Sequence, residues 1–211
     1  RALPGTDDAW NPFWSPDSQS VAFTAGTQLR RIDLRTNRVQ AIADVPSSVN
    51  GTWGRDGVIL LSANTGPIRL LRLAATGGTP VEVALPAALR GAVVSGPDFL
   101  PDGRRFIYHA RTSDPQTTGL YLGAVDDREH QFLVASDSQG EYAEPGFLVY
   151  LRNGSMLAQP FDPVSGALRT FLNQKAGNML DGNLYILDAS YSTSDGRSLA
   201  LFSRVRCKAK N

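Results

Sequence analysis

The 211-residue sequence contains one cysteine, Cys207, and only two histidines, His109 and His130. A single thiol cannot form an intrachain disulfide, so a disulfide-stapled fold is excluded. The sequence also lacks a run of about 20 apolar residues, the length that a membrane-spanning helix needs. We therefore expect no membrane insertion by this segment.

Neither sign of charge predominates, because 21 Lys and Arg residues are balanced by 20 Asp and Glu residues, which leaves a net charge of +1. Proteins that bind nucleic acid through its phosphates usually carry a clear basic excess. The most basic stretch, residues 30–38, is typical of the solvated face of two strands and their turn. We expect no nucleic-acid partner.

Helical periodicity is missing as well. No segment keeps a 3.6-residue apolar period over three turns, and the best candidate, residues 81–94, is interrupted by Pro86. At most a short helical turn fits there. Gly and Pro together form about 16% of the chain, above the usual level of about 12%. This composition favours an all-β protein with many short strands and tight turns.

A turn-and-strand motif occurs five times along the chain. Each copy has an aromatic residue, a short turn ending in Gly or Ser, and an apolar strand. The copies are FWSPDSQSVAF, TWGRDGVILL, DFLPDGRRFIYHA, YAEPGFLVYLR and YSTSDGRSLALFSR. Their turn residues Ser18, Gly57, Gly103, Gly146 and Gly196 are 39, 46, 43 and 50 residues apart. Repeats of this length indicate solenoids, propellers or similar arrays.

Two further strands follow each of the first four copies, joined by turns such as ATGGT and DPVSG. With the strand that precedes each turn, this gives about four antiparallel strands per repeat, the size of one propeller blade. The sequence therefore predicts a single β-propeller domain over residues 1–211, or a piece of a larger propeller. We expect five blades, with residues 1–6 supplying the last strand of the C-terminal blade and closing the ring.

The stretches PFWSPDSQSVAF, FLPDGRRFIYHARTSDP and GSMLAQPFDPVSGAL resemble TolB-type, WD-repeat-like β-propeller repeats. More narrowly, they resemble the propeller of bacterial membrane-anchored serine/threonine protein kinases. The resemblance implies a sensory or protein-interaction module in a periplasmic or extracellular location. The sequence has no Gly-rich phosphate loop, HRD loop or DFG motif, so it does not itself support kinase chemistry.

Motifs that carry catalysis are scarce, and we name no catalytic residue. There is no G-x-S-x-G elbow, H-E-x-x-H motif or EF-hand loop. We interpret His109 as a strand-end or blade-contact residue, His130 as solvated, and Cys207 as an incidental thiol. We expect no cofactor and no metal-binding motif. A structural calcium ion held at the central channel by carboxylates from several blades stays open.

Aromatic residues recur at matching positions of the repeats, namely Trp14, Trp53, Phe99 and Tyr142. A periodic aromatic is typical of packing between blades. Trp10 lies outside this pattern, in a connection that a propeller places on an end face. We therefore predict a ligand-binding set in the end-face connections, made of Asp7, Asp8, Trp10, Asn11, Arg55 and Tyr142.

The function most consistent with these features is a non-enzymatic sensor or binding module for a protein, peptide or small ligand at the axial face. The alternative is a propeller enzyme that uses carboxylates or a metal to hydrolyse or eliminate glycans or esters. A propeller accessory to a serine peptidase is a variant of that alternative. Paired acids in the central channel would favour the enzyme.

Overall fold

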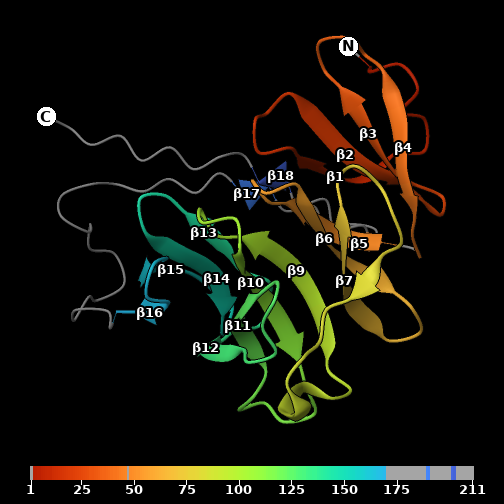
Figure 1. The fold of residues 1–211 in the computed structure, drawn as a ribbon. Coiled ribbons are helices and arrows are strands. Elements are labelled where there is room, and N and C mark those ends of the chain that lie inside the picture. The colour runs from red at the N-terminus through yellow and green to blue at the C-terminus, as the bar shows by residue number, and fades with distance from the viewer. Residues whose placement is uncertain (1, 47, 170–188, 191–200, 203–211) are drawn as a thin grey trace, which may run out of the picture.

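The computed structural model describes residues 2–46, 48–169, 189–190 and 201–202, and these form an all-β structure (Figure 1). Four antiparallel sheets of four strands each follow one another along the chain, with a two-stranded sheet after them. Within the described residues, the only helical segment is the 3-10 turn η1 (Ala87–Leu89). It follows Pro86, so the prediction of one short helical turn is confirmed.

The strands of the first sheet are β1 (Trp10–Trp14), β2 (Ser20–Ala25), β3 (Gln28–Asp33) and β4 (Val39–Asp44). Those of the second are β5 (Ser48–Trp53), β6 (Val58–Asn64), β7 (Ile68–Ala74) and β8 (Val81–Glu82). Those of the third are β9 (Val93–Phe99), β10 (Arg105–Arg111), β11 (Gly119–Ala124) and β12 (Gln131–Ala135). Those of the fourth are β13 (Glu141–Ala143), β14 (Phe147–Arg152), β15 (Ser155–Asp162) and β16 (Ala167–Leu168). The last pair is β17 (Ala189–Ser190) and β18 (Leu201–Phe202).

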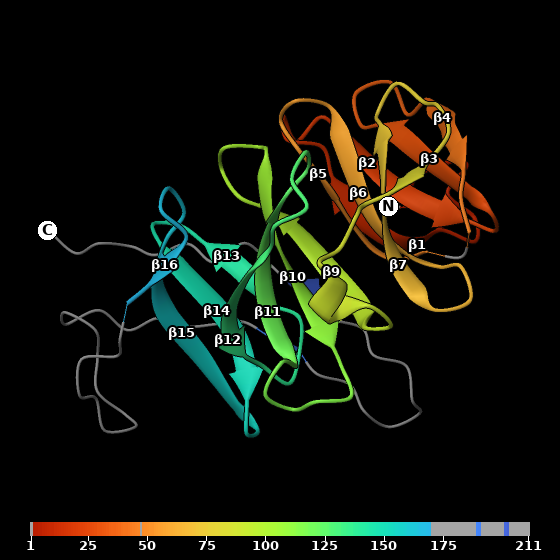
Figure 2. The ribbon, with the colours of Figure 1, turned by 60° about the horizontal axis from the view of Figure 1, so that its bottom comes forward.

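The first strands of consecutive sheets lie next to one another, since β1 contacts β5, β5 contacts β9, and β9 contacts β13. In every four-stranded sheet, the later strands follow outward in sequence order. The sheets therefore succeed each other around the first strands, as Figures 1 and 2 show. This is the arrangement of propeller blades, each a four-stranded meander with its first strand innermost.

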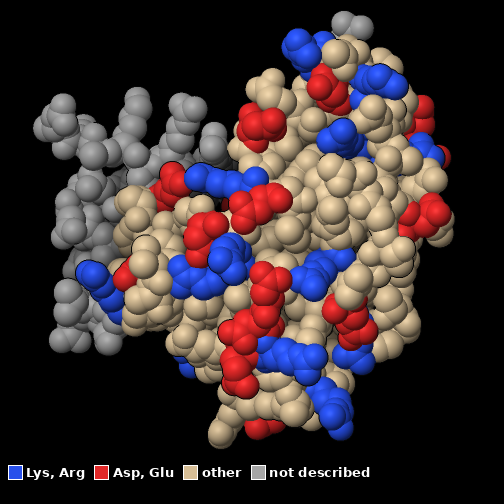
Figure 3. All heavy atoms as spheres, in the orientation of Figure 1, with Lys and Arg blue, Asp and Glu red and all other residues tan. Residues whose placement is uncertain are grey.

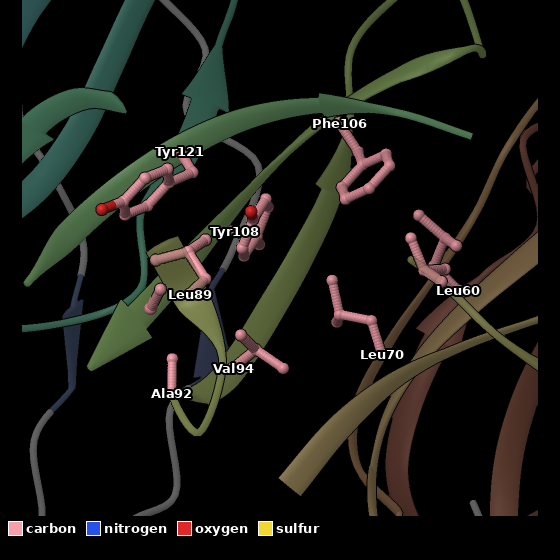
Figure 4. Close-up of a cluster of buried hydrophobic side chains, with 10 residues drawn as sticks. Leu60, Leu70, Leu89, Ala92, Val94, Phe106, Tyr108 and Tyr121 are labelled. Atoms are coloured by element: carbon pink, nitrogen blue, oxygen red, sulfur yellow. The ribbon is translucent and has the colours of Figure 1, made fainter. Parts of the chain in front are cut away.

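A separate apolar core lies between each pair of neighbours among the four described blades. Each core contains an aromatic side chain from the inner strand of the later blade, as the repeats predict: Trp53, Phe99 or Tyr142. Figure 4 shows the core between the second and third blades, where Leu60 and Leu70 face Phe106 and Tyr108. Burial of such side chains stabilises a fold by about 1.5–3 kcal/mol each.

The turn that opens each repeat is held by its own polar side chains. In the first blade, Ser15 Oγ donates to Asp17 Oδ1 at 2.6 Å, and this hydrogen bond keeps the pKa of Asp17 below its usual value. In the third, Asp102 Oδ1 accepts hydrogen bonds from the backbone N–H groups of Arg104 and Arg105. Ser18 and Gly103 both adopt positive φ, +57° and +71°, which ends the turn. The recurring motif is therefore an architectural element.

The N-terminal residues differ from the prediction. Residues 2–9 form turns, with Gly5 at φ +72° and a hydrogen bond from Ala9 N to Thr6 O, so a strand over residues 2–6 is wrong. The Pro4-Gly5 pair favours a turn over an extended strand. The fifth repeat lies mostly outside the described residues. From this part of the chain the structure describes only β17, β18 and their pairing. The count of five blades stays a prediction.

Deleting residues 1–8 should therefore shift the melting temperature by less than about 3 °C. The described part of this segment is almost entirely exposed and pairs with no strand. Thermal unfolding followed by circular dichroism measures the effect, with the intact chain as reference. A loss of 10 °C or so would mean that the segment contributes a strand to the fold after all.

Candidate binding surfaces

Trp10 begins the inner strand of the first blade and is 63% exposed. Asp7 and Asp8 precede it in an exposed turn, and neither side chain has a hydrogen bond or ion pair within the described residues. Asn11, at φ +50°, lies within a β-bulge that interrupts the register between Trp10 and Phe13. Bulges in inner strands re-aim neighbouring side chains. These four predicted residues form one surface at the start of β1.

Arg55 lies elsewhere, in the turn that follows β5. Thr52 contacts Phe99, and three residues further on Arg55 approaches Gly103, so neighbouring inner strands run in the same direction. Trp10 starts such a strand and Arg55 follows the end of one, which places them at opposite ends of the blades. The predicted set is therefore split between two surfaces.

Tyr142, in the middle of β13, belongs to the core between the third and fourth blades, where it packs edge-on against Phe161. Its backbone N–H donates to Asp98 Oδ2 on the neighbouring inner strand at 3.0 Å. The N–H of Phe99 makes the matching contact one blade earlier, with Thr52 Oγ1 at 3.4 Å. The side chains at this position therefore join consecutive inner strands.

Asp98 is the most perturbed carboxyl group of the inner strands. Burial raises its pKa to about 7, the negative charge of Glu141 adds to this effect, and the Tyr142 hydrogen bond opposes it. The raised pKa of Asp98 has no signal in the sequence, because Asp98 occupies a position that holds Phe13 and Thr52 in the preceding blades. Asp98 and Glu141 bring two acids to neighbouring inner strands.

The histidines lie inside the third blade. His109 is buried and its Nε2 is 3.1 Å from the Ser136 carbonyl oxygen, consistent with the blade-contact interpretation. His130 is partly buried, with Nδ1 2.7 Å from the Tyr108 hydroxyl, so the solvated interpretation is wrong. Its Nε2 is buried without a partner. Burial lowers the pKa of both imidazoles.

An open groove of about 530 Å³ lies at the same end of the blades as Arg55. It runs between the second blade and the turns of the third, and its lining includes Arg72, Arg104 and Asp126. Arg72 Nη1 is 3.1 Å from Asp126 Oδ1, and Arg104 Nη2 is 3.7 Å from Oδ2. These partners are far apart in sequence, so sequence reasoning missed the groove.

Over the face drawn in Figure 3, acidic and basic side chains are interspersed, and no broad field of one sign is visible. Among the described residues, no group of three or more His, Cys, Asp or Glu side chains could hold a metal ion. No helix in that part of the chain has the length and hydropathy to cross a membrane.

Solved structures with the same arrangement include a putative TolB from Agrobacterium tumefaciens, with a TM-score of 0.56 and 17% identity. The fold is that of a TolB-like propeller. TolB from Acinetobacter baumannii has a TM-score of 0.57 at 18% identity, and an oligogalacturonate lyase in complex with manganese has 0.53 at 15%. The matches cover 79%, 72% and 76% of this chain.

The chain spans only 62%, 40% and 52% of those three proteins. No protein-family model matches the chain, and no curated protein matches it. At identities this low, the similarity establishes the propeller fold. Propellers support both binding and catalysis, so function must be argued from the surfaces of this chain.

Proposed function

We propose that this TolB-like propeller is a non-enzymatic binding module that recognises a protein, peptide or small ligand at the end face where the inner strands begin. The observation that carries the proposal is the exposure of Trp10 at the start of β1, 63% of its surface. Tryptophan is enriched among the residues that dominate binding energy at interfaces. A large apolar side chain left in water has the most surface to bury against a partner.

The surroundings of Trp10 favour recognition of a partner with a positive charge or several donors. Asp7 and Asp8 offer two exposed carboxylates in the turn that precedes Trp10. Because Trp10 belongs to a paired strand, it is positioned before binding, which lowers the ordering cost. Such a module would suit the sensory role that the resemblance to kinase-linked propellers implies, and that role is part of the proposal.

Replacing Trp10 with alanine should weaken binding at least about tenfold for peptides selected from a random library against the wild-type protein. Binding is measured by isothermal titration calorimetry, and circular dichroism checks that the variant is folded. Val164→Ala is the matched control, because Val164 is an exposed apolar residue, 79% accessible, in the turn after β15. If selected peptides bind Trp10→Ala and wild type equally well, this end face is not the binding surface.

A second candidate function, a carboxylate-dependent propeller enzyme, is favoured by one observation. Asp98 has a pKa of about 7 and lies near a second acid, Glu141. A carboxyl group that is half protonated near neutral pH can act as a general acid or base. Turnover of polygalacturonate or gluconolactone that disappears in Asp98→Asn would support this alternative. The contact with Tyr142 N–H gives Asp98 a structural role that needs no catalysis.

A further inference from the structure

We infer that the groove between the second and third blades is a second binding site, which takes a small organic ligand through its carboxylate. The groove is separate from the Trp10 surface, because it is formed by turns at the opposite end of the blades. Its volume of about 530 Å³ lies within the range of about 300–1,000 Å³ typical of small-molecule sites.

Two guanidinium groups converge in this groove on a single carboxylate. Arg72 Nη1 also donates to the Val125 carbonyl oxygen at 3.1 Å, which fixes its side chain against the third blade. The other guanidinium nitrogens of Arg72 and Arg104 make no hydrogen bond within the described residues, and the two side chains are 41% and 71% exposed. A guanidinium has five N–H donors, so most of the donor capacity faces solvent.

A third cation lies at the rim. Gly103 adopts φ +71°, and a side chain there would lie 3.4 Å from Arg55 Cβ, so the two turns are in close approach. Arg55 has no ion pair within the described residues. Two acids line the groove. Asp56 has no ion pair within the described residues, whereas Asp126 forms ion pairs with both Arg72 and Arg104. The lining itself holds two arginines and two acids, so its capacity for an anion comes from the guanidinium N–H groups of Arg72 and Arg104 that face solvent, with Arg55 next to the rim.

The position of Asp126 indicates which anion fits. Its carboxylate bridges both arginines, which shows that a planar carboxylate can be accommodated between them. Next to these charges, Val58, Leu73 and Val81 provide an apolar surface, and Val81 is 53% exposed. A carbon chain attached to a carboxylate can cover that surface, whereas inorganic phosphate cannot. The chemistry therefore favours a carboxylic acid with a short apolar body.

Glutarate is a suitable probe for this site. Calorimetric titration of the full chain at low ionic strength should show saturable binding, and amide shifts in NMR spectra should be confined to the two blades. We expect Arg104→Gln to weaken binding at least about fivefold, since it removes a charge-assisted contact. Asp126→Asn should instead tighten binding about threefold or more, because it frees both arginines and removes a repelling charge.

The opposite signs of these two effects separate a binding site from a merely structural ion pair, whose loss would not improve affinity. Arg38→Gln is the matched control, because Arg38 is an exposed arginine in a turn of the first blade. Three results would overturn the inference: no saturable glutarate binding, equal affinity of wild type and Arg104→Gln, or tighter binding of inorganic phosphate than of glutarate. None of them bears on the Trp10 surface.

Discussion

Tyr108→Ala is expected to lower the free energy of unfolding by about 3–5 kcal/mol. Tyr108 is fully buried at the centre of the core between the second and third blades. Its ring stacks on Tyr121 and contacts Phe106, so truncation leaves a cavity lined by large side chains. Figure 4 shows these rings side by side on β10 and β11. Urea unfolding followed by tryptophan fluorescence gives the value.

Phe132→Ala serves as the control for cavity formation. Phe132 also contacts Tyr121, but it is 40% exposed. Its replacement should therefore lower the free energy of unfolding by less than about 1.5 kcal/mol. Tyr108→Phe keeps the ring and removes only the hydroxyl that pairs with His130 Nδ1, at a cost of about 1–2 kcal/mol. Equal losses for Tyr108→Ala and Phe132→Ala would contradict the packing described for this core.

Stability should fall as pH rises through the titration of Asp98. Its pKa is about 7 in the folded protein and 3.8 without the fold, so the folded state binds more protons between these values. Its stabilising contribution is complete below about pH 4, falls progressively between pH 4 and 7, and is absent above about pH 7. One pKa unit corresponds to about 1.4 kcal/mol, and partial exposure reduces the total, so we expect a fall of about 2–4 kcal/mol.

Asp98→Asn isolates this effect, because an amide oxygen can still accept from Tyr142 N–H but cannot ionise. The lowered pKa values of His109 and His130 act in the opposite direction, reducing stability below about pH 6.5 in both proteins. The contribution of the histidines therefore cancels when the free energy of unfolding of Asp98→Asn is subtracted from that of the wild type at each pH. Denaturant unfolding between pH 4 and 8 measures it, and parallel curves for the two proteins would refute the assignment.

The periodic features were accessible from the sequence because each blade solves the same packing problem. Trp53, Phe99 and Tyr142 recur because each inner strand must bury an aromatic side chain against the preceding blade. The turn motif recurs because the chain must reverse between the first two strands of every blade. Hydrogen bonds within the turn, such as that from Ser15 to Asp17, are local and follow from residue type.

Features that depend on single contacts were not accessible. His130 looks like a turn residue, yet its ring forms a hydrogen bond with the hydroxyl group of Tyr108, 22 positions earlier. Trp14 matches Trp53 in the repeat, but Trp14 is 59% exposed, whereas Trp53 packs into the core between the first two blades. A repeated motif predicts the environment that equivalent residues have in common. It does not predict the difference in burial between Trp14 and Trp53.

The sequence alone determined an all-β propeller, its strand order and its inter-blade aromatics, because alternation, turn chemistry and spacing are local properties of the chain. The tertiary structure decided which polar residues meet. It separated Arg55 from Trp10, placed Asp98 beside Tyr142, and brought Arg72 to Asp126 across 54 positions. These pairings depend on how one blade packs against the next, and that contact has no local signal in the sequence.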